Sequence, residues 1–545
     1  MIKDKILTLS LLSLTMLNAC GSNDPVIIDD DKEQEKPVEP EKPDEPDTPP
    51  SQYATSSLWT EFISCQTSGN EATLSDYSYA GYKHGELDVP DVAYKVFRVD
   101  DFGAVPNDGK SDRKALTDAI EAAKANGEGV ILFSAGRYDL RTEDAPNEPV
   151  IIDADKIVLR GAGCESGGTE LFMEHPNQVL DASLWNTPEL ISFRYVRSTD
   201  KKLADITGNA TKGSFSVEID NTASLTAGDR VFIRLSNNDP RLITQELGGY
   251  DADANWTELM TQGVQVTEYH EVAKVSGNKV TFKEPIMHAI DSQWGWTLHE
   301  HSCHKGNGVE DIAFVGNFKE PFSHHLNALH DSGFRMLTLS RQVDGWVRRC
   351  RFTDVSEALS VVLSGNVSVY SCSITGNPGH SAIRAQASTG VFIGKVNDQA
   401  GQFHSVGVSK TSIGTVLWRN TWTAATCFEA HASQPRCTLF DACEGGFMAA
   451  RSGGDEAAAP NHLGELILWN FNETDGGEKD FDTWRRNTRW VRPVIVGMHG
   501  GSTSFKTAQV TAEEGNGTLM EPLSLYEAQI TRRLGAIPQW LNNLK

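Results

Sequence analysis

The sequence has no close cysteine pairs and no excess of positive charge. Its nine cysteines among 545 residues include no CxxC pair, so a zinc cluster is not expected. Acidic side chains outnumber basic ones by 25, which leaves no basic footprint for a nucleic-acid partner. The apolar run from Ile6 to Leu17 is too short to span a membrane comfortably. These absences count against zinc-ribbon, nucleic-acid-binding and membrane-spanning classes.

Short apolar strands recur between Trp346 and Asn472. Strands beginning at Val347, Val369 and Val391 are spaced by 22 residues. Later strands follow at slightly longer steps, around Val416, Thr438 and Leu466. One strand of this length cannot bury its own face, so such a period is typical of a stacked solenoid. The residues alternate with the period of two that marks strands. We predict an all-β fold, a right-handed parallel β-helix.

This spacing predicts which side chains face outward. If one set of strand residues stacks in the interior, the residue after each of them points out. The predicted interior set is Cys350, Cys372, Gly394, Trp418 and Phe440. The predicted outward set is Arg351, Ser373, Lys395, Arg419 and Asp441. Cations at strand spacing suit a linear polyanion, so Arg351, Lys395 and Arg419 are predicted to bind substrate. Cys350 and Cys372 are predicted to fill the interior rather than form a bridge.

The first 52 residues are interpreted as an export signal and a tether. Residues 1–20 have lysines, an apolar run and small residues before Cys20, which resembles a bacterial lipoprotein signal with lipid on that thiol. Residues 21–52 are rich in proline and charge, with eleven acids against three lysines in 21–50, and are predicted to be disordered. An acidic stretch after the lipidated cysteine resembles surface lipoproteins of Bacteroidetes. The expected location is the outer membrane at the cell surface, with the periplasm as the alternative.

The body is predicted to consist of a catalytic β-helix over residues 53–480 and a C-terminal strand and capping segment over 481–545. A loop or β insertion is expected at about 200–300. The segment from Phe97 to Tyr138 contains a DFGA turn, a helix from Arg113 to Ala125 and a strand ending in GRY. It resembles the opening of the pectate-lyase-like superfamily, which implies a β-helix with an N-terminal capping helix. A helix opening near Leu525 is predicted to cap the other end.

Histidines recur at equivalent places on successive coils, and they form the candidate site. His380 and His404 each precede a strand position by 14 residues, and His431 and His462 enter the next two coils. Arg384, Arg419 and Arg436 lie among them. Histidine titrates near neutral pH and suits a catalytic base. Arginine is permanently charged and binds a carboxylate through two hydrogen bonds. The predicted catalytic residues are His380, Arg384, His404, Lys410, His431 and Arg436, and His462 is predicted to bind substrate.

The predicted reaction is β-elimination on a uronate glycan, which needs a cation for the carboxylate, a base for the C5 proton and an acid for the leaving oxygen. His404 or His431 is the predicted base, and Lys410 is the alternative. Clustered acidic ligands for Ca²⁺ are missing from the repeats, so a mechanism without metal or cofactor is favoured, with a divalent cation such as Ca²⁺ kept open. The sequence lacks the carboxylate pair of β-helix glycoside hydrolases, since Asp344 and Asp441 stand apart.

Two passages, Gly401 to Asn420 and His431 to Gly446, together with the C-terminal segment, resemble polysaccharide lyase family 29. That resemblance implies a lyase acting on chondroitin- and dermatan-type glycosaminoglycans to give 4,5-unsaturated products. The alternatives are a β-helix hydrolase acting on pectin-like or other glycans and a non-catalytic surface protein that binds glycans. The predicted partners are an anionic polysaccharide and, through the N-terminal lipid, a membrane. The protein is predicted to be a monomer.

Overall fold

The computed structural model describes residues 52–197, 200–222, 224–447 and 453–545, which belong to one unit, Ser51–Lys545. The predicted signal with Cys20, and the predicted tether up to residue 51, lie outside the described residues. No helix in the described ranges is long and apolar enough to cross a bilayer.

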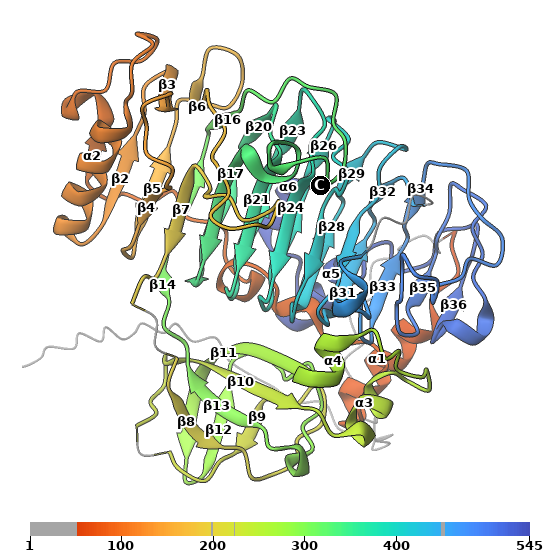
Figure 1. Ribbon diagram of the computed structural model, residues 1–545. Coiled ribbons are helices and arrows are strands. Elements are labelled where there is room, and N and C mark those ends of the chain that lie inside the picture. The colour runs from red at the N-terminus through yellow and green to blue at the C-terminus, as the bar shows by residue number, and fades with distance from the viewer. Residues whose placement is uncertain (1–51, 198–199, 223, 448–452) are drawn as a thin grey trace, which may run out of the picture. The chain divides into compact units, whose positions relative to one another are not determined.

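Three parallel sheets run along the molecule and together form a parallel β-helix (Figure 1). The coils in the middle of the solenoid, such as β19–β20–β21 and β22–β23–β24, contribute one strand to each sheet in turn. The twelve-stranded sheet contains β1 (Val96–Arg98), β2 (Gly129–Leu132), β5 (Ile157–Arg160), β15 (Gly308–Glu310), β19 (Trp346–Arg348), β22 (Ser368–Tyr370), β25 (Phe392–Gly394), β28 (Ile413–Trp418), β31 (Arg436–Asp441), β33 (Leu466–Trp469), β35 (Val494–Val496) and β36 (Ala512–Glu514).

The other two sheets have fewer strands. The nine-stranded sheet contains β3 (Gly136–Arg141), β6 (Thr169–Met173), β16 (Ala313–Val315), β20 (Arg351–Thr353), β23 (Ser373–Thr375), β26 (Asn397–Asp398), β29 (Thr421–Trp422), β32 (Glu444–Gly445) and β34 (Asn472–Glu473). The seven-stranded sheet contains β4 (Val150–Ile152), β7 (Ile191–Arg194), β17 (Arg335–Ser340), β21 (Glu357–Val362), β24 (Ser381–Gln386), β27 (Gly407–Ser409) and β30 (Glu429–His431). A short pair, β14 (His304–Lys305) and β18 (Gln342–Val343), is also parallel.

The repeat length differs from the predicted one. Val347 pairs with Val369 as predicted, but Val369 pairs with Ile393, 24 residues later, and not with Val391. The preceding strands still keep the 22-residue step, because Phe352 pairs with Ile374. The two additional residues therefore lie in the turn between β23 and β24. Turns at the surface accept insertions that a hydrogen-bonded ladder does not.

This shift breaks the predicted columns. Cys350, Cys372 and Phe440 belong to the solenoid interior, but Trp418 packs on its outer face. The eight described cysteines are free, which confirms that Cys350 and Cys372 fill the interior. Of the predicted cations, Arg351 lies in β20, whereas Lys395 and Arg419 occupy turns with φ of 51° and 50°. The prediction of one continuous basic column was wrong.

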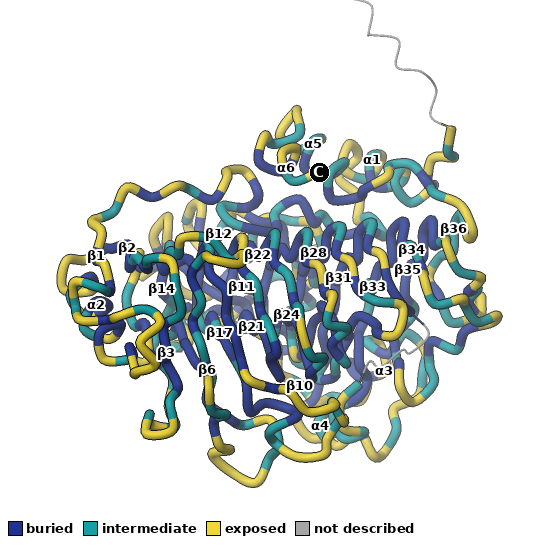
Figure 2. Tube along the Cα trace, turned by 90° about the horizontal axis from the view of Figure 1, so that it is seen from above, coloured by how far each residue is buried: buried dark blue, intermediate teal, exposed yellow. Residues whose placement is uncertain are grey.

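The N- and C-terminal segments cover the outer face of the twelve-stranded sheet (Figure 2). These segments contain α1 (Ser57–Ser68), α5 (Leu525–Leu534) and α6 (Gln539–Leu544). The Asp441 carboxylate accepts hydrogen bonds from the backbone nitrogens of Leu525 and Tyr526 at the start of α5, both at 3.0 Å. The predicted C-terminal cap thus lies along the side of the solenoid. At the first coils, α2 (Arg113–Asn126) buries Leu116, Ile120 and neighbouring alanines in the same core as the strands.

The segment between β7 and β14 forms a separate antiparallel sheet on the side of the solenoid. It contains β8 (Lys202–Asp205), β9 (Ser216–Glu218), β10 (Arg230–Asn237), β11 (Val264–Ser276), β12 (Lys279–Phe282) and β13 (Thr297–Glu300), with α3 (Pro240–Glu246) and α4 (Thr257–Gln262). We call this segment the insertion. It has its own apolar core, and a buried ion pair between Arg436 and Glu246 (2.7 Å) fastens it to the coils.

The remaining helical turns are short. They are η1 (Tyr77–Tyr79), η2 (Tyr82–Gly85), η3 (Val99–Phe102), η4 (Ser292–Trp294), the π-helix η5 (Leu329–Gly333), η6 (Glu456–Ala458) and η7 (Thr507–Gln509).

Candidate active site

The outer face of the seven-stranded sheet carries a row of polar and charged side chains. Strand alternation sends Leu359, Ala385 and Ala430 into the solenoid core. The neighbouring positions face outward, and the strand pairing aligns Ser360, Arg384, Gly407 and Glu429 across β21, β24, β27 and β30. We call this face, with the loop before η5 that lies against it, the histidine face.

A buried ion pair crosses the centre of the histidine face. Arg384 Nη1 lies 3.1 Å from Glu429 Oε2, although β27 separates their strands. Gly407 makes this contact possible, because a Cβ at that position would lie 2.2 Å from the Glu429 carbonyl oxygen. The Glu429 side chain is only 1% exposed and that of Arg384 11%. The pair is therefore shielded from solvent screening.

A second carboxylate is held on the other side of Arg384. Glu357 lies 2.5 Å from Arg335 Nε, 3.6 Å from Arg384 Nη2 and 3.7 Å from His380 Nδ1. Burial opposes its ionisation, but Arg335, His380 and Arg384 outweigh burial and hold the pKa of Glu357 far below its usual value. Glu357 is therefore a stable anion at neutral pH.

Two histidines flank Glu429. Nε2 of His404 and Nε2 of His431 lie 3.6 Å and 3.8 Å from the same Oε1 atom of Glu429. Burial lowers the pKa of His404 well below its usual value, helped by the nearby charges of His380, His431 and Arg384. Burial also lowers the pKa of His431. The negative charge of Glu429 acts in the opposite direction but does not outweigh burial. Both rings are thus neutral at pH 7. His431 is the more accessible, with 34% of its side chain exposed against 5% for His404.

Some buried polar atoms of this face have no hydrogen-bond partner among the described residues. They are Oε1 of Glu357, Oε1 of Glu429, Nε of Arg384 and Nδ1 of His404. Buried polar groups in folded proteins are nearly always paired, so each such group calls for an explanation. A ligand with its own donors and acceptors would satisfy them.

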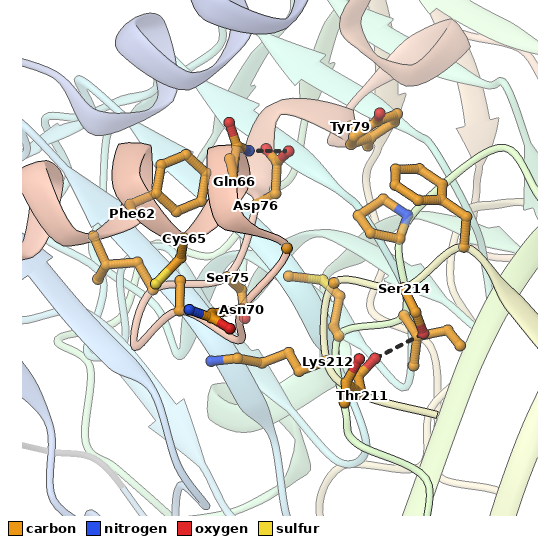
Figure 3. A pocket seen from close by; sticks show the side chains of 18 of the residues that line it. Phe62, Cys65, Gln66, Asn70, Ser75, Asp76, Tyr79, Thr211, Lys212 and Ser214 are labelled. Carbon is orange, nitrogen blue, oxygen red and sulfur yellow. Dashed lines mark hydrogen bonds between the residues drawn. The ribbon is translucent and has the colours of Figure 1, made fainter. Parts of the chain in front are cut away.

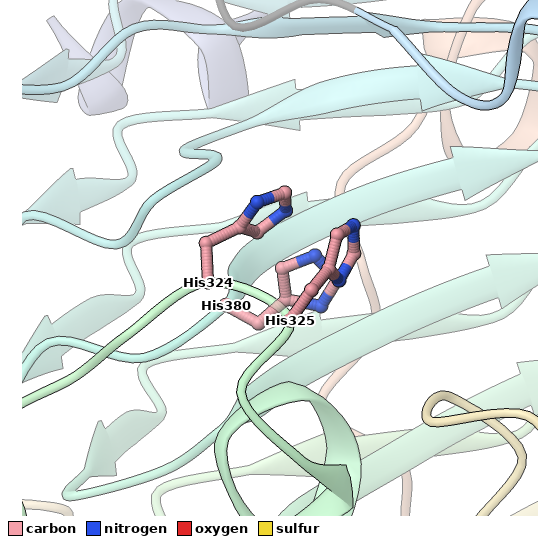
Figure 4. A group of neighbouring side chains, drawn as sticks. All are labelled: His324, His325 and His380. Carbon is pink, nitrogen blue, oxygen red and sulfur yellow. The ribbon is translucent and has the colours of Figure 1, made fainter.

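Two more imidazoles join His380 at the edge of the histidine face (Figure 4). His324 and His325 come from the loop before η5, and His380 precedes β24. One nitrogen of each lies within 4.8 Å of the others, so these three residues of the described part of the chain could hold a metal ion. The ring centroids of His380 and His404 are 5.4 Å apart, so this group adjoins the Glu429 network.

The structure brings together four of the predicted catalytic residues: His380, Arg384, His404 and His431. Lys410 follows β27 and is exposed. Desolvation by the surrounding protein lowers the pKa of its ammonium group, and the charges of Arg384 and Arg335 lower it further.

The other predicted site residues lie elsewhere. Arg436 is buried beneath the insertion, where Nη1 donates to the Gln265 carbonyl at 2.7 Å. His462 is fully buried on Thr438 (2.9 Å), and burial lowers its pKa to about 3. Arg351 donates to the Cys164 carbonyl, Lys395 to the Lys545 carbonyl and Arg419 to Glu527. These five positions therefore support neighbouring segments, and the structure does not place them on the histidine face.

Sequence reasoning missed the acidic residues and one pair of histidines. Glu429 stands two positions before His431 in one strand, so alternation alone could have placed both on one face. Glu357 and Arg335 become neighbours of Arg384 only through strand pairing. His324 and His325 precede the regular repeats, and no periodic signal marks them.

A separate cavity of about 710 Å³ lies between α1, the insertion and α5 (Figure 3). Its lining includes Gln66, Asp76, Tyr79, Lys212 and Arg533. None of the predicted site residues lines it.

Comparison with known proteins gives partial matches. A family described as a domain of unknown function (DUF4955) matches residues 401–544. The chain is 36% identical over 81 residues to the mannuronan C5-epimerase AlgE3 of Azotobacter vinelandii and 35% identical over 81 residues to AlgE1 of the same organism. These matches span 14% of this chain, and only 4% and 6% of the respective epimerases.

Several solved structures are similar at low identity. The Pseudomonas phage phi297 tailspike gp61 has a TM-score of 0.36 at 10% identity, with 75% of each chain covered. An exopolygalacturonase from Thermotoga maritima has a TM-score of 0.35 at 10% identity, covering 77% of this chain and 82% of its own. PfbA, a surface adhesin of Streptococcus pneumoniae, has a TM-score of 0.39 at 10% identity, covering 76% and 80%.

Proposed function

We propose that the protein is a polysaccharide lyase that cleaves a uronate-containing anionic glycan on the histidine face. One observation carries the proposal: a buried cation, Arg384, and two neutral histidines, His404 and His431, surround the same carboxylate, Glu429. Elimination requires a cation for the uronate carboxylate, a base and a proton donor within reach of one sugar ring. These groups lie on adjacent coils.

In the proposed reaction, His431 is the base because its ring is the more exposed and is neutral at pH 7. It takes the C5 proton, and the electrons of that C–H bond form the C4–C5 double bond. The C4–O4 bond breaks and its electrons stay on O4, to which the N–H of neutral His404 donates a hydrogen bond. The imidazolium of His431 then gives its proton to O4 and returns to the neutral form. Arg384 stabilises the negative charge that builds up on the carboxylate. Lys410, with its lowered pKa, is the alternative base.

Hydrolysis is the second candidate, and the two carboxylates bridged by Arg384 favour it. A hydrolase needs one of its carboxyl groups protonated to act as the acid. The pKa of Glu357 is far below its usual value, because burial is outweighed by Arg335, His380 and Arg384, so Glu357 does not suit that role. We therefore place hydrolysis second.

The finer features of the proposal come from the sequence resemblance. A chondroitin- or dermatan-type glycosaminoglycan is the proposed substrate, and Cys20 is proposed to anchor the protein to the outer membrane at the cell surface. The partial match to mannuronan C5-epimerases supports chemistry at C5 of a sugar polymer, because elimination removes a proton from that carbon.

The test is to mix the purified protein with chondroitin sulfates, dermatan sulfate, hyaluronan, alginate and pectin, and to follow the ultraviolet absorbance of unsaturated uronate. We expect a rise on one glycan. His431→Ala should lower the rate by about 10²- to 10⁴-fold, the usual contribution of a general base. Lys395→Ala, a cation on another face, is the matched control.

New reducing ends without absorbance would establish the hydrolase. If neither absorbance nor reducing ends appear, but the protein migrates more slowly in a gel that contains glycan, the protein binds glycan without cleaving it. The pH profile gives an independent check. Because the base must be unprotonated and the pKa of His431 is lowered by burial, kcat/KM should stay constant from pH 8 down to about 6.5 and fall at lower pH.

A further inference from the structure

Asp331 fixes the orientation of two of the three histidines at the edge of the histidine face. Its Oδ2 lies 2.8 Å from Nδ1 of His325, and its backbone carbonyl oxygen lies 3.1 Å from Nδ1 of His380. When Nδ1–H donates to such a partner, the lone pair of Nε2 is free for a metal ion. Histidines that ligate metals nearly always have this second partner.

Asp331 is itself rigidly held. It is fully buried in the π-helix η5, and its Oδ1 accepts a hydrogen bond from the His325 backbone nitrogen at 3.0 Å. Single π-turns occur frequently at functional sites. The carboxylate therefore fixes both the backbone and the ring of His325.

The backbone brings two consecutive rings to one side. His325 has φ of 60°, in the left-handed region that non-glycine residues seldom adopt. As a result, the ring centroids of His324 and His325 lie 3.6 Å apart. His324 also stacks on Phe403, with centroids 3.9 Å apart. Strained backbone of this kind gathers at ligand sites, where the surrounding structure maintains it.

We propose that His324, His325 and His380 bind one first-row transition-metal ion such as Zn²⁺, with Asp331 as the residue that positions them. Three imidazoles match the preference of Zn²⁺ for nitrogen, whereas Ca²⁺ and Mg²⁺ prefer oxygen ligands. Three protein ligands leave a fourth position for water or a substrate oxygen. The nitrogens of a tetrahedral zinc site lie about 3.4 Å apart, and one nitrogen of each of the three rings lies within 4.8 Å of the others.

The metal site itself does not rest on the proposed lyase activity. Its position beside His404 would nevertheless let the ion bind the carboxylate of a uronate and share the role given to Arg384. The sequence favours a mechanism without metal because the repeats have no clustered acidic ligands, whereas His324 and His325 precede the repeats.

The experiment uses the full chain, purified with an affinity tag that contains no histidine and stripped with a chelator. Zn²⁺ and Co²⁺ are added separately, and bound metal is counted by mass spectrometry after gel filtration. We expect one equivalent of either ion, and visible absorption of Co²⁺ typical of a four-coordinate nitrogen site. Excess Ca²⁺ should not displace them.

Variants make the assignment specific. His325→Ala and His380→Ala should lose the bound ion, and Asp331→Asn should weaken binding by about 10- to 100-fold, as outer-shell changes do. His175→Ala, which removes a histidine with 42% of its side chain exposed, is the control and should bind as the wild type does. His325→Ala also removes the ring partner of the buried Asp331 carboxylate, so a thermal melt of this variant without metal verifies that it remains folded.

The proposal is overturned if the wild-type protein binds no ion, or if His325→Ala and His380→Ala bind as well as the wild type. Because binding is measured without substrate, a protein that holds the metal but cleaves no glycan contradicts the lyase alone. A protein that cleaves glycan but binds no metal contradicts only the metal site.

Discussion

Replacing Glu429 by glutamine should destabilise the solenoid. The change removes a negative charge that lies 3.1 Å from Arg384 and leaves that cation with Glu357, 3.6 Å away, as its nearest carboxylate. Removing one partner of a buried ion pair costs about 3 to 5 kcal/mol. Glutamine keeps an oxygen that can accept from Arg384, so we expect the lower end, a loss of about 3 kcal/mol in the free energy of unfolding.

A double-mutant cycle tests whether Arg384 and Glu429 stabilise the fold as a pair, and its second single change is Arg384→Met. In the double variant Arg384→Met with Glu429→Gln, neither an unpaired cation nor an unpaired anion of this pair remains. The free energies should therefore be non-additive, with a coupling of about 1 to 3 kcal/mol. Activity should not return in the double variant, because Arg384 is proposed to stabilise the reacting carboxylate.

Chemical denaturation at pH 7, followed by tryptophan fluorescence, measures both effects. Glu444→Gln is the matched control, since this glutamate is exposed on the nine-stranded sheet and its carboxylate accepts a hydrogen bond from the Asn472 side chain at 2.8 Å. Surface changes of this kind stay within about 0.5 kcal/mol. The reasoning is refuted if Glu429→Gln is as stable as this control, or if the two single changes simply add.

Three further predictions test other parts of the structure. Gly407→Ala should lower the free energy of unfolding by about 1 to 3 kcal/mol, because the added Cβ would clash with Glu429. Gly365→Ala is the control and should be tolerated, because its Cβ would have its nearest contact at 3.4 Å. Denaturation curves compare the two variants. Arg436→Met should expose the insertion to limited proteolysis, because it breaks a buried ion pair, and an unchanged digestion rate would contradict this. His270 is buried, but two glutamates outweigh burial and raise its pKa to about 9, so its stabilisation is present below pH 6.5 and lost as the pH rises through about 9. The thermal midpoint of the wild type should fall over that range, and His270→Gln should flatten the curve.

The coil architecture could be predicted from the strands alone. Each strand is too short to be stable by itself, and its alternating pattern exposes an apolar face that only a neighbouring coil can cover. The pairing of Val347 with Val369 follows the predicted step. The following coil is longer by two residues within a surface turn, and a shift of this kind is invisible to a search for a fixed period. The prediction of a basic column was wrong for this reason: the longer coil shifts the register, so Lys395 and Arg419 lie in turns and not in strands.

The candidate site was predicted in part. Recurrence on successive coils pointed to His380, His404 and His431, and parallel pairing does place these coils side by side. The same argument selected His462, which the structure buries on Thr438. Recurrence predicts that residues stack, but it does not say whether a later segment will cover them.

The sequence by itself determined the period-two strands, the free interior cysteines and the histidines carried by neighbouring coils, because these depend on local alternation and on contacts between adjacent repeats. Tertiary structure decided the rest. The terminal helices cover the twelve-stranded sheet and the insertion covers Arg436, whereas the seven-stranded sheet keeps a polar outer face with a partly exposed His431. The loop that brings His324 and His325 to His380 lies about 55 residues away in the chain, and only the stacking of coils joins them. Contacts between segments so far apart are set by packing and buried charge, which no short stretch of sequence contains.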